Sequence, residues 1–412
     1  MFRALKHYNL RVFLAGQLCS LIGTWMQLVA GSWLIYRLTD SPLLLGFFAF
    51  ALNFPALVFS PLAGVAADRF DRRSLLVLIN TLSMVQAVVL WALVRTGTVQ
   101  VWHIMALSVF LGILNAYELP VRQSLISQLI EDPKDLPNAI ALHSSVFNGS
   151  RLLGPAVAGI AIAALGEGVC FLLNALSFLP VIALLCLMRL PVKVAGNVSG
   201  GGIREGFAYV YGSIPIRMLL ILVAVLSMAS GAFHSLAPVF AKRVFGGGPE
   251  MLGLLLSCSG FGALLGAAYL AGRRTVIGLG RVVALAGMAT GVSYMLFAVT
   301  VEIHQAAFAA FLCGVFIIMS IGGSNVIIQT LVEERMRGRV MSLYGLALVG
   351  ISPFGSIIAG AAAVRSGPMP ALFFVGISGA AAMLWFWFRL PRFRSHVRPI
   401  YVKKVLFLIF RS

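Results

Sequence analysis

Apolar residues fill this chain in long runs, and short polar breaks separate the runs. Each run is about 20 residues or longer, which is the length that an α-helix needs to cross a bilayer. The pattern therefore predicts an all-α polytopic membrane protein with twelve transmembrane helices. The runs cover roughly residues 12–36, 43–67, 74–94, 101–121, 138–164, 169–188, 217–241, 250–272, 281–300, 305–331, 340–363 and 369–389.

One long break falls near the middle of the chain. It joins spans six and seven and contains three consecutive glycines at 200–202, as linkers commonly do. We expect a segment within it, residues 203–211, to form a short amphipathic helix on the membrane surface. The predicted organisation is a six-helix bundle, a linker, a second six-helix bundle and a basic tail, at 1–189, 190–216, 217–390 and 391–412.

The two predicted bundles share a sequence feature. Span five carries Gly154-Pro155 followed by Gly159, and span eleven, six spans later, carries Ser352-Pro353 followed by Gly355 and Gly360. Two related halves with a substrate path between them are typical of secondary transporters.

Composition excludes an ordinary water-soluble protein. Apolar residues make up 60% of the chain and charged residues 11%, and the mean hydropathy is +0.98. The net charge of +18 would indicate nucleic acid as the partner of a soluble protein. In this chain the basic residues lie between apolar spans, so we reject nucleic acid and expect contact with anionic lipid head groups.

The basic residues also predict the orientation. An even number of spans places both termini on one side, and 25 of the 31 Lys and Arg residues lie in the segments on that side. Only five lie in the loops on the other side, and Arg151 lies within a span. This bias predicts that both termini are cytoplasmic. The basic start of the chain leads into an apolar span with no clear cleavage site, so we expect an uncleaved first helix.

No motif of an enzyme or metal protein is present in the sequence. The five cysteines lie in apolar stretches without a CxxC pair, and the chain has no phosphate-binding GxxxxGK[ST], HExxH or GxSxG motif. We therefore predict a protein that is not an enzyme, with no cofactor and no metal. An ion gradient would supply the energy for any transport.

Residues 64–73 form a charged break between spans two and three. Gly64 and Asp68 are four residues apart and share a helix face, while Asp68 and Arg72 have the spacing of an ion pair. The segment resembles the Gly-x-x-x-Asp-Arg-x-Gly-Arg-Arg loop of the major facilitator superfamily, with Asp71 in place of the second glycine. The resemblance implies that Asp68, Arg69 and Arg72 form a conformational latch, whereas a purely topogenic basic loop is the alternative.

Two ionisable residues lie well inside spans, where charge is costly and commonly functional. Arg151 is near the middle of span five, and Glu118 is nearer the cytoplasmic end of span four, one turn before Arg122. In one interpretation Glu118 is the proton-coupling carboxylate and Arg151 is a cavity cation that pairs with Glu118 or with an anionic substrate group. In the other, Glu118 and Arg122 form a fixed pair and Arg151 binds carbonyl groups.

Longer strings identify a branch of the superfamily. The series Ser150, Gly154, Pro155, Ala158 and Gly159 resembles the Gly-x-x-x-Gly-Pro-x-x-Gly-Gly motif of drug and metabolite antiporters. Together with residues 119–124, 138–142 and 337–345, it resembles the secretion-effector branch, which includes enterobactin exporters. The resemblance implies a monomer in the bacterial inner membrane that exports siderophores, drugs or other small metabolites.

Other polar or aromatic residues within spans are candidates for the lining of a cavity. Hydrogen bonding between helices is the alternative for each amide, and packing is the alternative for the histidine. The candidates are Trp25, Gln27, Asn53, Asn115, Asn148, His234, Asn325 and Gln329. The sequence thus predicts a proton-driven exporter of a small amphipathic metabolite or drug. The alternatives are a proton-coupled importer and a membrane sensor or assembly protein that transports nothing.

Overall fold

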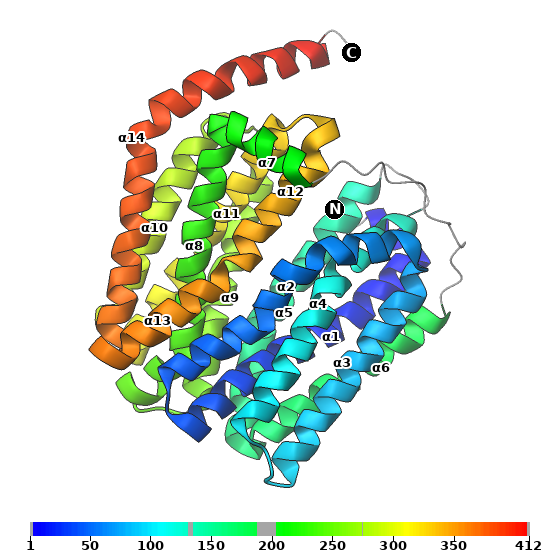
Figure 1. Ribbon diagram of the computed structural model, residues 1–412, viewed down its shortest axis with the longest axis vertical. Helices are drawn as coiled ribbons and strands as arrows, with labels where there is room; N and C mark the ends of the chain where they lie inside the picture. Colours follow the sequence, from blue (N-terminus) through cyan, green and yellow to red (C-terminus); the bar gives the residue numbers. More distant parts are fainter. Residues whose placement is uncertain (1–2, 131–134, 188–202, 274, 410–412) are drawn as a thin grey trace.

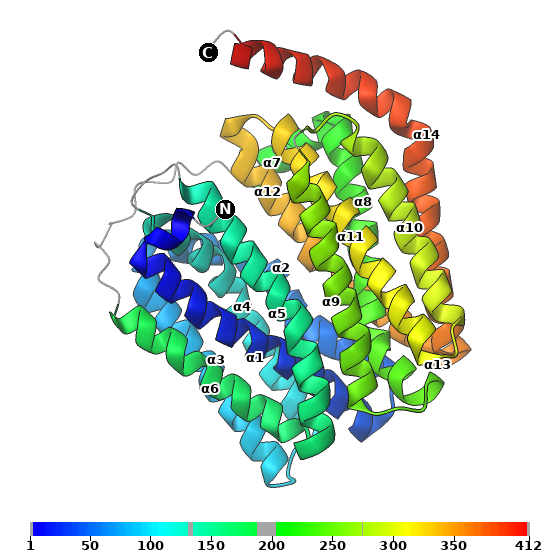
Figure 2. The same ribbon diagram turned by 180° about the vertical axis from the view of Figure 1, so that it is seen from behind.

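The computed structural model describes residues 3–130, 135–187, 203–273 and 275–409. Its described residues contain twelve helical segments that are long and apolar enough to cross a membrane. Figures 1 and 2 show them in two bundles, one drawn in blue to green and the other in green to red. The prediction of an all-α fold with twelve spans is confirmed.

Each bundle contributes six spans. The first bundle comprises α1 (Tyr8–Thr39), α2 (Pro42–Arg69), α3 (Arg72–Arg95), α4 (Val101–Gln128), α5 (Leu136–Leu165) and α6 (Glu167–Leu187). The second comprises α8 (Ile214–Val239), α9 (Pro249–Gly272), α10 (Leu279–Val299), α11 (Ile303–Leu331), α12 (Arg337–Gly345), α13 (Ser352–Ser366) and α14 (Pro368–Ile409). A π-helical turn, Leu346–Gly350, joins α12 to α13, and the three pieces together form the eleventh span.

The internal repeat is visible where spans five and eleven end. Gly166 follows α5 with φ 81° and ψ 171°, and Gly367 follows α13 with φ 87° and ψ 165°. Side chains disfavour this backbone region, so glycine ends both helices in the same way. In each case the next helix begins at the following residue.

Helix pairs hold the two bundles together in a pattern that reflects the repeat. Helix α2 packs on α13 and helix α5 packs on α9, so span two meets span eleven and span five meets span eight. Small residues allow close approach: a Cβ atom on Gly159 would lie 2.9 Å from the carbonyl oxygen of Pro249 and 3.1 Å from the Cα atom of Gly253. Close backbone packing of this kind is typical of small residues in membrane helices.

The two ends of the molecule differ in how closely the bundles approach. One end holds the connection between α1 and α2, and we call it the Asp40 end. There the helices of the two bundles lie against one another. The other end holds α7 and the start of the chain, and we call it the linker end. The bundles diverge toward this end in both views (Figures 1 and 2).

Two predicted segments outside the bundles are helical. Helix α7 (Ile203–Gly212) forms where a short helix is expected, and its Glu205 pairs with Arg339 of α12. Helix α14 runs through most of the predicted tail and turns across the linker end in Figure 1. Residues 380–409 contain no glycine, so little in this segment favours ending the helix, although Pro391 and Pro399 fall within it.

Candidate functional site

A cluster of side chains around Arg151 lies at the interface between the bundles. Arg151 lies midway along α5, roughly 21 Å from either end of the helix. Its Nη2 atom is 3.4 Å from Nε2 of His234 on α8, and its guanidinium carbon is 5.9 Å from the ring centroid of Trp25 on α1. The cluster therefore joins two helices of the first bundle to one of the second.

Arg151 has no carboxylate partner in the part of the chain that the structure describes. Besides His234 and Trp25, the phenol of Tyr294 on α10 is close enough to interact with it electrostatically. The Arg151 and His234 side chains are both half-buried. A cation at membrane depth without an anion is unfavourable unless water or a ligand compensates it.

Aromatic rings line one side of the cluster. The Trp25 ring meets the Phe147 ring edge-on at 6.1 Å, and the side chain of Phe147 is 37% exposed. Gly154 brings Trp25 to this place, since a Cβ atom on Gly154 would lie 2.4 Å from Cβ of Trp25. The predicted span-five motif thus holds Trp25 through Gly154 and reaches α9 through Gly159 and the backbone of Pro155.

Glu118 forms an ion pair within its own helix. Its Oε1 atom is 2.9 Å from Nη1 of Arg122, which also lies 3.3 Å from Oε1 of Gln17. The Arg122 side chain is 8% exposed and that of Glu118 is 20% exposed. Because both residues lie on α4, a rigid movement of the helix does not separate them. The structure thus shows the pair that the sequence left as one alternative, and a coupling role for Glu118 stays a prediction.

The predicted amides take several different positions. Gln27 is buried inside the first bundle, where it donates to Gln86 at 2.9 Å and accepts from Asn174 at 2.6 Å. It therefore joins α1 to α3 and α6 by hydrogen bonds between helices, which is the alternative to lining a cavity. Asn53 and Asn148 each donate to a carbonyl one turn earlier, Asn325 accepts from Gln329 within α11, and Asn115 is exposed.

The predicted latch lies at the junction of α2 and α3. Gly64, Asp68 and Arg69 belong to the last turns of α2. The side chains of Asp68 and Arg69 lie outside the described part of the structure. Arg72 begins α3. Asp71 has φ −61° and accepts a hydrogen bond from the backbone N–H of Ser74 at 2.8 Å, so it caps α3 where the superfamily pattern has glycine.

A second charged cluster, which the sequence reasoning missed, joins the bundles at the Asp40 end. Asp40 has φ 49° and follows α1. Its carboxylate lies 2.7 Å from Nη2 of Arg243 and 3.3 Å from Nζ of Lys242, both in a π-helical turn after α8. Both cations also lie over the ring of Tyr36. The sequence did contain one indication of this cluster. Lys242 and Arg243 are adjacent basic residues on the side of the membrane that is predicted to carry few basic residues.

We expect Asp40→Asn to weaken contact between the bundles at this end. An exposed ion pair contributes about 0.2–1 kcal/mol of stabilising free energy. The population of molecules in which the Asp40 end is closed should therefore fall by up to about fivefold. The hydrogen bond from Arg243 lowers the pKa of Asp40, so the pair is intact above the ordinary carboxylate pKa and is lost as pH falls through the lowered value. Labelling of a single cysteine at this end should increase in Asp40→Asn; unchanged labelling would show that the pair does not hold the end closed.

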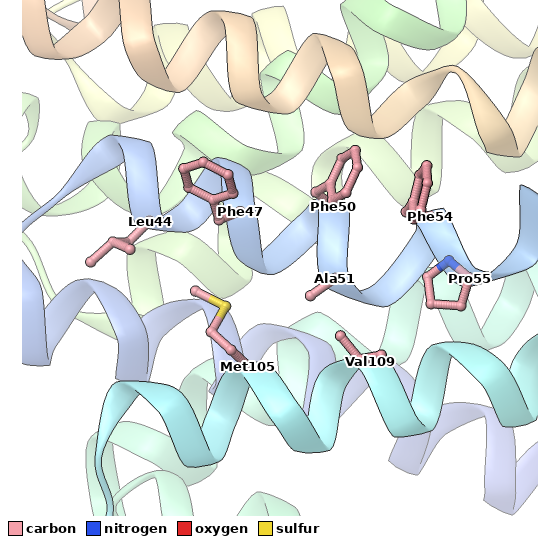
Figure 3. Close-up of a pocket in the computed structure, with 8 residues that line it drawn as sticks. All are labelled: Leu44, Phe47, Phe50, Ala51, Phe54, Pro55, Met105 and Val109. Carbon is pink, nitrogen blue, oxygen red and sulfur yellow. The ribbon is translucent and has the colours of Figure 1, made fainter.

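An apolar pocket lies between α2 and α4 (Figure 3). It encloses about 350 Å³, and none of the predicted polar residues lines it. One of its rings, Phe50, also meets Phe354 of α13 edge-on at 5.6 Å. Its lining residues are Leu44, Phe47, Phe50, Ala51, Phe54, Pro55, Met105 and Val109.

Comparison of the sequence with known proteins finds transporters. The chain is 25% identical over 387 residues to the staphyloferrin A transporter of Staphylococcus aureus (strain NCTC 8325 / PS 47), with 92% of this chain and 95% of that protein covered. It is 26% identical over 382 residues to the multidrug efflux pump Tap of Mycolicibacterium fortuitum, with 88% and 91% covered.

Comparison with solved structures confirms the fold. The structure resembles a bacterial homologue of the human lysosomal transporter Spinster in an inward-facing, unoccupied conformation, with a TM-score of 0.71, 16% identity and coverage of 96% of this chain and 97% of that one. It also resembles the nucleoside transporter NupG, with a TM-score of 0.72, 14% identity and coverage of 92% and 98%.

The family model for transmembrane secretion effectors matches residues 1–402, which is nearly the whole chain. The relatives with which it aligns over most of their length are transporters, in agreement with the predicted absence of enzymatic function. The chain therefore belongs to the transmembrane secretion effector family of the major facilitator superfamily, and it is a transporter with twelve membrane-spanning helices.

Proposed function

We propose that the protein exports a small amphipathic metabolite, siderophore or drug in exchange for protons, by alternating access between its two bundles. Glu118 is the proposed proton-binding carboxylate. Among the carboxylates in the candidate spans of the described residues, only Glu118 lies more than one turn from a span end. Trp25, Asn148 and Arg151 are proposed to line the substrate path, with Asn53 and Asn325 as further lining residues.

The observation that carries the proposal is the asymmetry of contact between the bundles. They are joined at the Asp40 end by Asp40 and Arg243 and by the close approach of Gly159 to α9, and they diverge toward the linker end. Arg151, a cation for which the described residues provide no carboxylate partner, lies between these two ends. Alternating access requires this combination of one closed end, one open end and a site between them.

Support for export comes from the names of the relatives. A multidrug efflux pump and a siderophore transporter align with most of this chain, and the span-five series resembles that of antiporters. Uptake by proton symport uses the same scaffold and is the second candidate. We further propose that the protein is a monomer of the bacterial inner membrane with both termini in the cytoplasm, and that its basic linker-end surface contacts anionic lipids.

Transport into inverted membrane vesicles tests the function. Vesicles with and without an imposed proton gradient are supplied with a panel of dyes and siderophores, and vesicles that lack the protein are the control. Export predicts accumulation that depends on both the protein and the gradient. Loss of preloaded compound on acidification of the lumen would instead favour symport, and no protein-dependent flux of any compound would contradict the proposed function.

We expect Asp68→Asn to slow the transport cycle and to leave substrate binding nearly unchanged, because the residue lies in the last turn of α2, more than two turns beyond the proposed lining residue Asn53. A fall in the rate of flux of about tenfold, equivalent to about 1.4 kcal/mol, would fit a latch. Rates from vesicle uptake and affinities from equilibrium binding separate the two effects. An equal loss of affinity would contradict the latch.

A further inference from the structure

We infer that Arg151, Trp25 and Phe147 form a binding site for the carboxylate and the adjoining ring of an aromatic or similarly flat amphipathic anion. This inference rests on the proposed function, because it names the chemical class of the transported solute. It assigns the charged group of the solute to the guanidinium and its apolar body to the two rings.

The charge of Arg151 favours an anionic ligand. The guanidinium of Arg151 lies at mid-membrane depth, where an uncompensated cation is strongly unfavourable. Among the described residues, its hydrogen-bond partner is one nitrogen of His234, at 3.4 Å. For that nitrogen to accept a hydrogen bond the imidazole must be neutral, so His234 positions the guanidinium without neutralising it.

The candidate acids among the described residues are already paired elsewhere. Glu118 binds Arg122, Glu167 binds Arg37, and Asp40 binds Arg243 and Lys242. Among the described residues, no carboxylate forms an ion pair with Arg151 in this conformation. The missing anion is therefore best supplied by a bound solute, and a guanidinium is suited to bind a carboxylate through two parallel hydrogen bonds.

Two aromatic rings form a surface next to the cation. Trp25 presents its ring to Arg151 at 5.9 Å and to Phe147 at 6.1 Å. Both rings are partly exposed, and they come from different helices, α1 and α5. An aromatic solute that binds Arg151 with its carboxylate has these rings within reach for stacking or edge-on contact.

The site also touches both bundles. Arg151 contacts α8 through His234, and a Cβ atom on Gly260 of α9 would lie 2.7 Å from the backbone oxygen of Arg151. A solute bound at Arg151 therefore lies where the second bundle meets the first. This position suits a site that is exposed to each side of the membrane in turn.

Binding to the purified full-length protein tests the inference without any transport. The probes are 2-naphthaleneacetate and its neutral carboxamide, titrated against wild type, Arg151→Gln, Arg151→Lys and Arg365→Gln. Arg365 is an exposed arginine at the end of α13, so Arg365→Gln is the matched control for loss of one positive charge. Size-exclusion chromatography of each variant checks that it is folded.

We expect the wild type to bind the carboxylate at least about tenfold more tightly than the carboxamide, because a charge-assisted hydrogen bond is about twice as strong as a neutral one. Arg151→Gln should lose this preference, Arg151→Lys should keep part of it, and Arg365→Gln should keep all of it. Equal affinity for the two probes, binding of neither probe, or a preference that survives in folded Arg151→Gln would overturn the inference.

The proposed function and the anion site fail in different ways. Gradient-driven export of neutral dyes with no binding preference for the carboxylate would leave the exporter intact and refute the site. Arg151-dependent binding of the carboxylate with no flux of any compound would support the site and refute the proposed export.

Discussion

Replacing Gly159 by Leu should reduce transport by about fivefold or more. A Cβ atom at this position would already lie 2.9 Å from the carbonyl oxygen of Pro249 and 3.1 Å from the Cα atoms of Glu250 and Gly253. All three neighbours are backbone atoms, so no side chain can move aside. Overpacking of this kind costs about 1–3 kcal/mol, which lowers the population closed at the Asp40 end by about 5- to 150-fold.

The measurement is the initial rate of uptake into inverted vesicles, divided by the amount of protein in the membrane. Gly379→Leu is the matched control, because a Cβ atom on Gly379 of α14 would have no neighbouring atom within 4 Å. We expect that control to transport at close to the wild-type rate. Wild-type transport by Gly159→Leu would show that close approach of α5 and α9 is not part of the cycle.

Replacing Glu118 by Gln should make accumulation independent of the proton gradient. The variant keeps the size of the side chain but cannot carry or release a proton, so substrate should equilibrate without being concentrated. The change also leaves Arg122, which is 8% exposed, without its carboxylate. Since Glu118 is partly exposed, we expect a stability loss of about 1–3 kcal/mol, below that of a fully buried pair.

Glu167→Gln separates coupling from stability. The carboxylate of Glu167 pairs with Arg37 at 2.6 Å within the first bundle, and its side chain is 9% exposed. Its loss should destabilise the protein to a similar extent and should leave gradient dependence intact. Gradient-dependent accumulation by Glu118→Gln would assign Glu118 a structural role, and its loss in both variants would show that the effect comes from destabilisation.

The number and the class of the helices could be predicted because the membrane imposes them. A bilayer requires about 20 apolar residues for each crossing, and this requirement marks the spans without any knowledge of packing. The glycines of span five could also be identified, since small residues at fixed spacing indicate close contact. What Gly159 contacts, the backbone of α9, became known only from the structure.

The composition of the site depends on how each helix is rotated about its axis, which hydropathy does not report. Gln27 and Trp25 lie two residues apart on α1, but Gln27 faces α3 and α6 whereas Trp25 faces Arg151. His234 appears in the sequence as an isolated histidine, and only the packing of α8 on the first bundle brings it to Arg151.

The Asp40 cluster was missed for another reason. Lys242 and Arg243 lie 202 and 203 positions after Asp40 in the sequence. Asp40 has a left-handed backbone conformation, which is unusual for a residue other than glycine. A turn of this kind is set by the helices on either side of it. Charge counting placed Lys242 and Arg243 on this side of the membrane but gave them no partner.

Alternating access between the bundles is the central claim, and distances at both ends of the reconstituted protein test it most directly. Spin labels are placed at Thr96 and Val301 for the Asp40 end and at Tyr8 and Ile277 for the linker end, all exposed positions, in a variant without native cysteines. Pulsed electron paramagnetic resonance then gives both distance distributions at several pH values, with and without a transported dye. We predict two populations of molecules. The Asp40-end distance is longer and the linker-end distance shorter in one population than in the other, and the ratio of the two populations changes with pH. A single distance at each end, unchanged by pH or dye, would contradict this prediction.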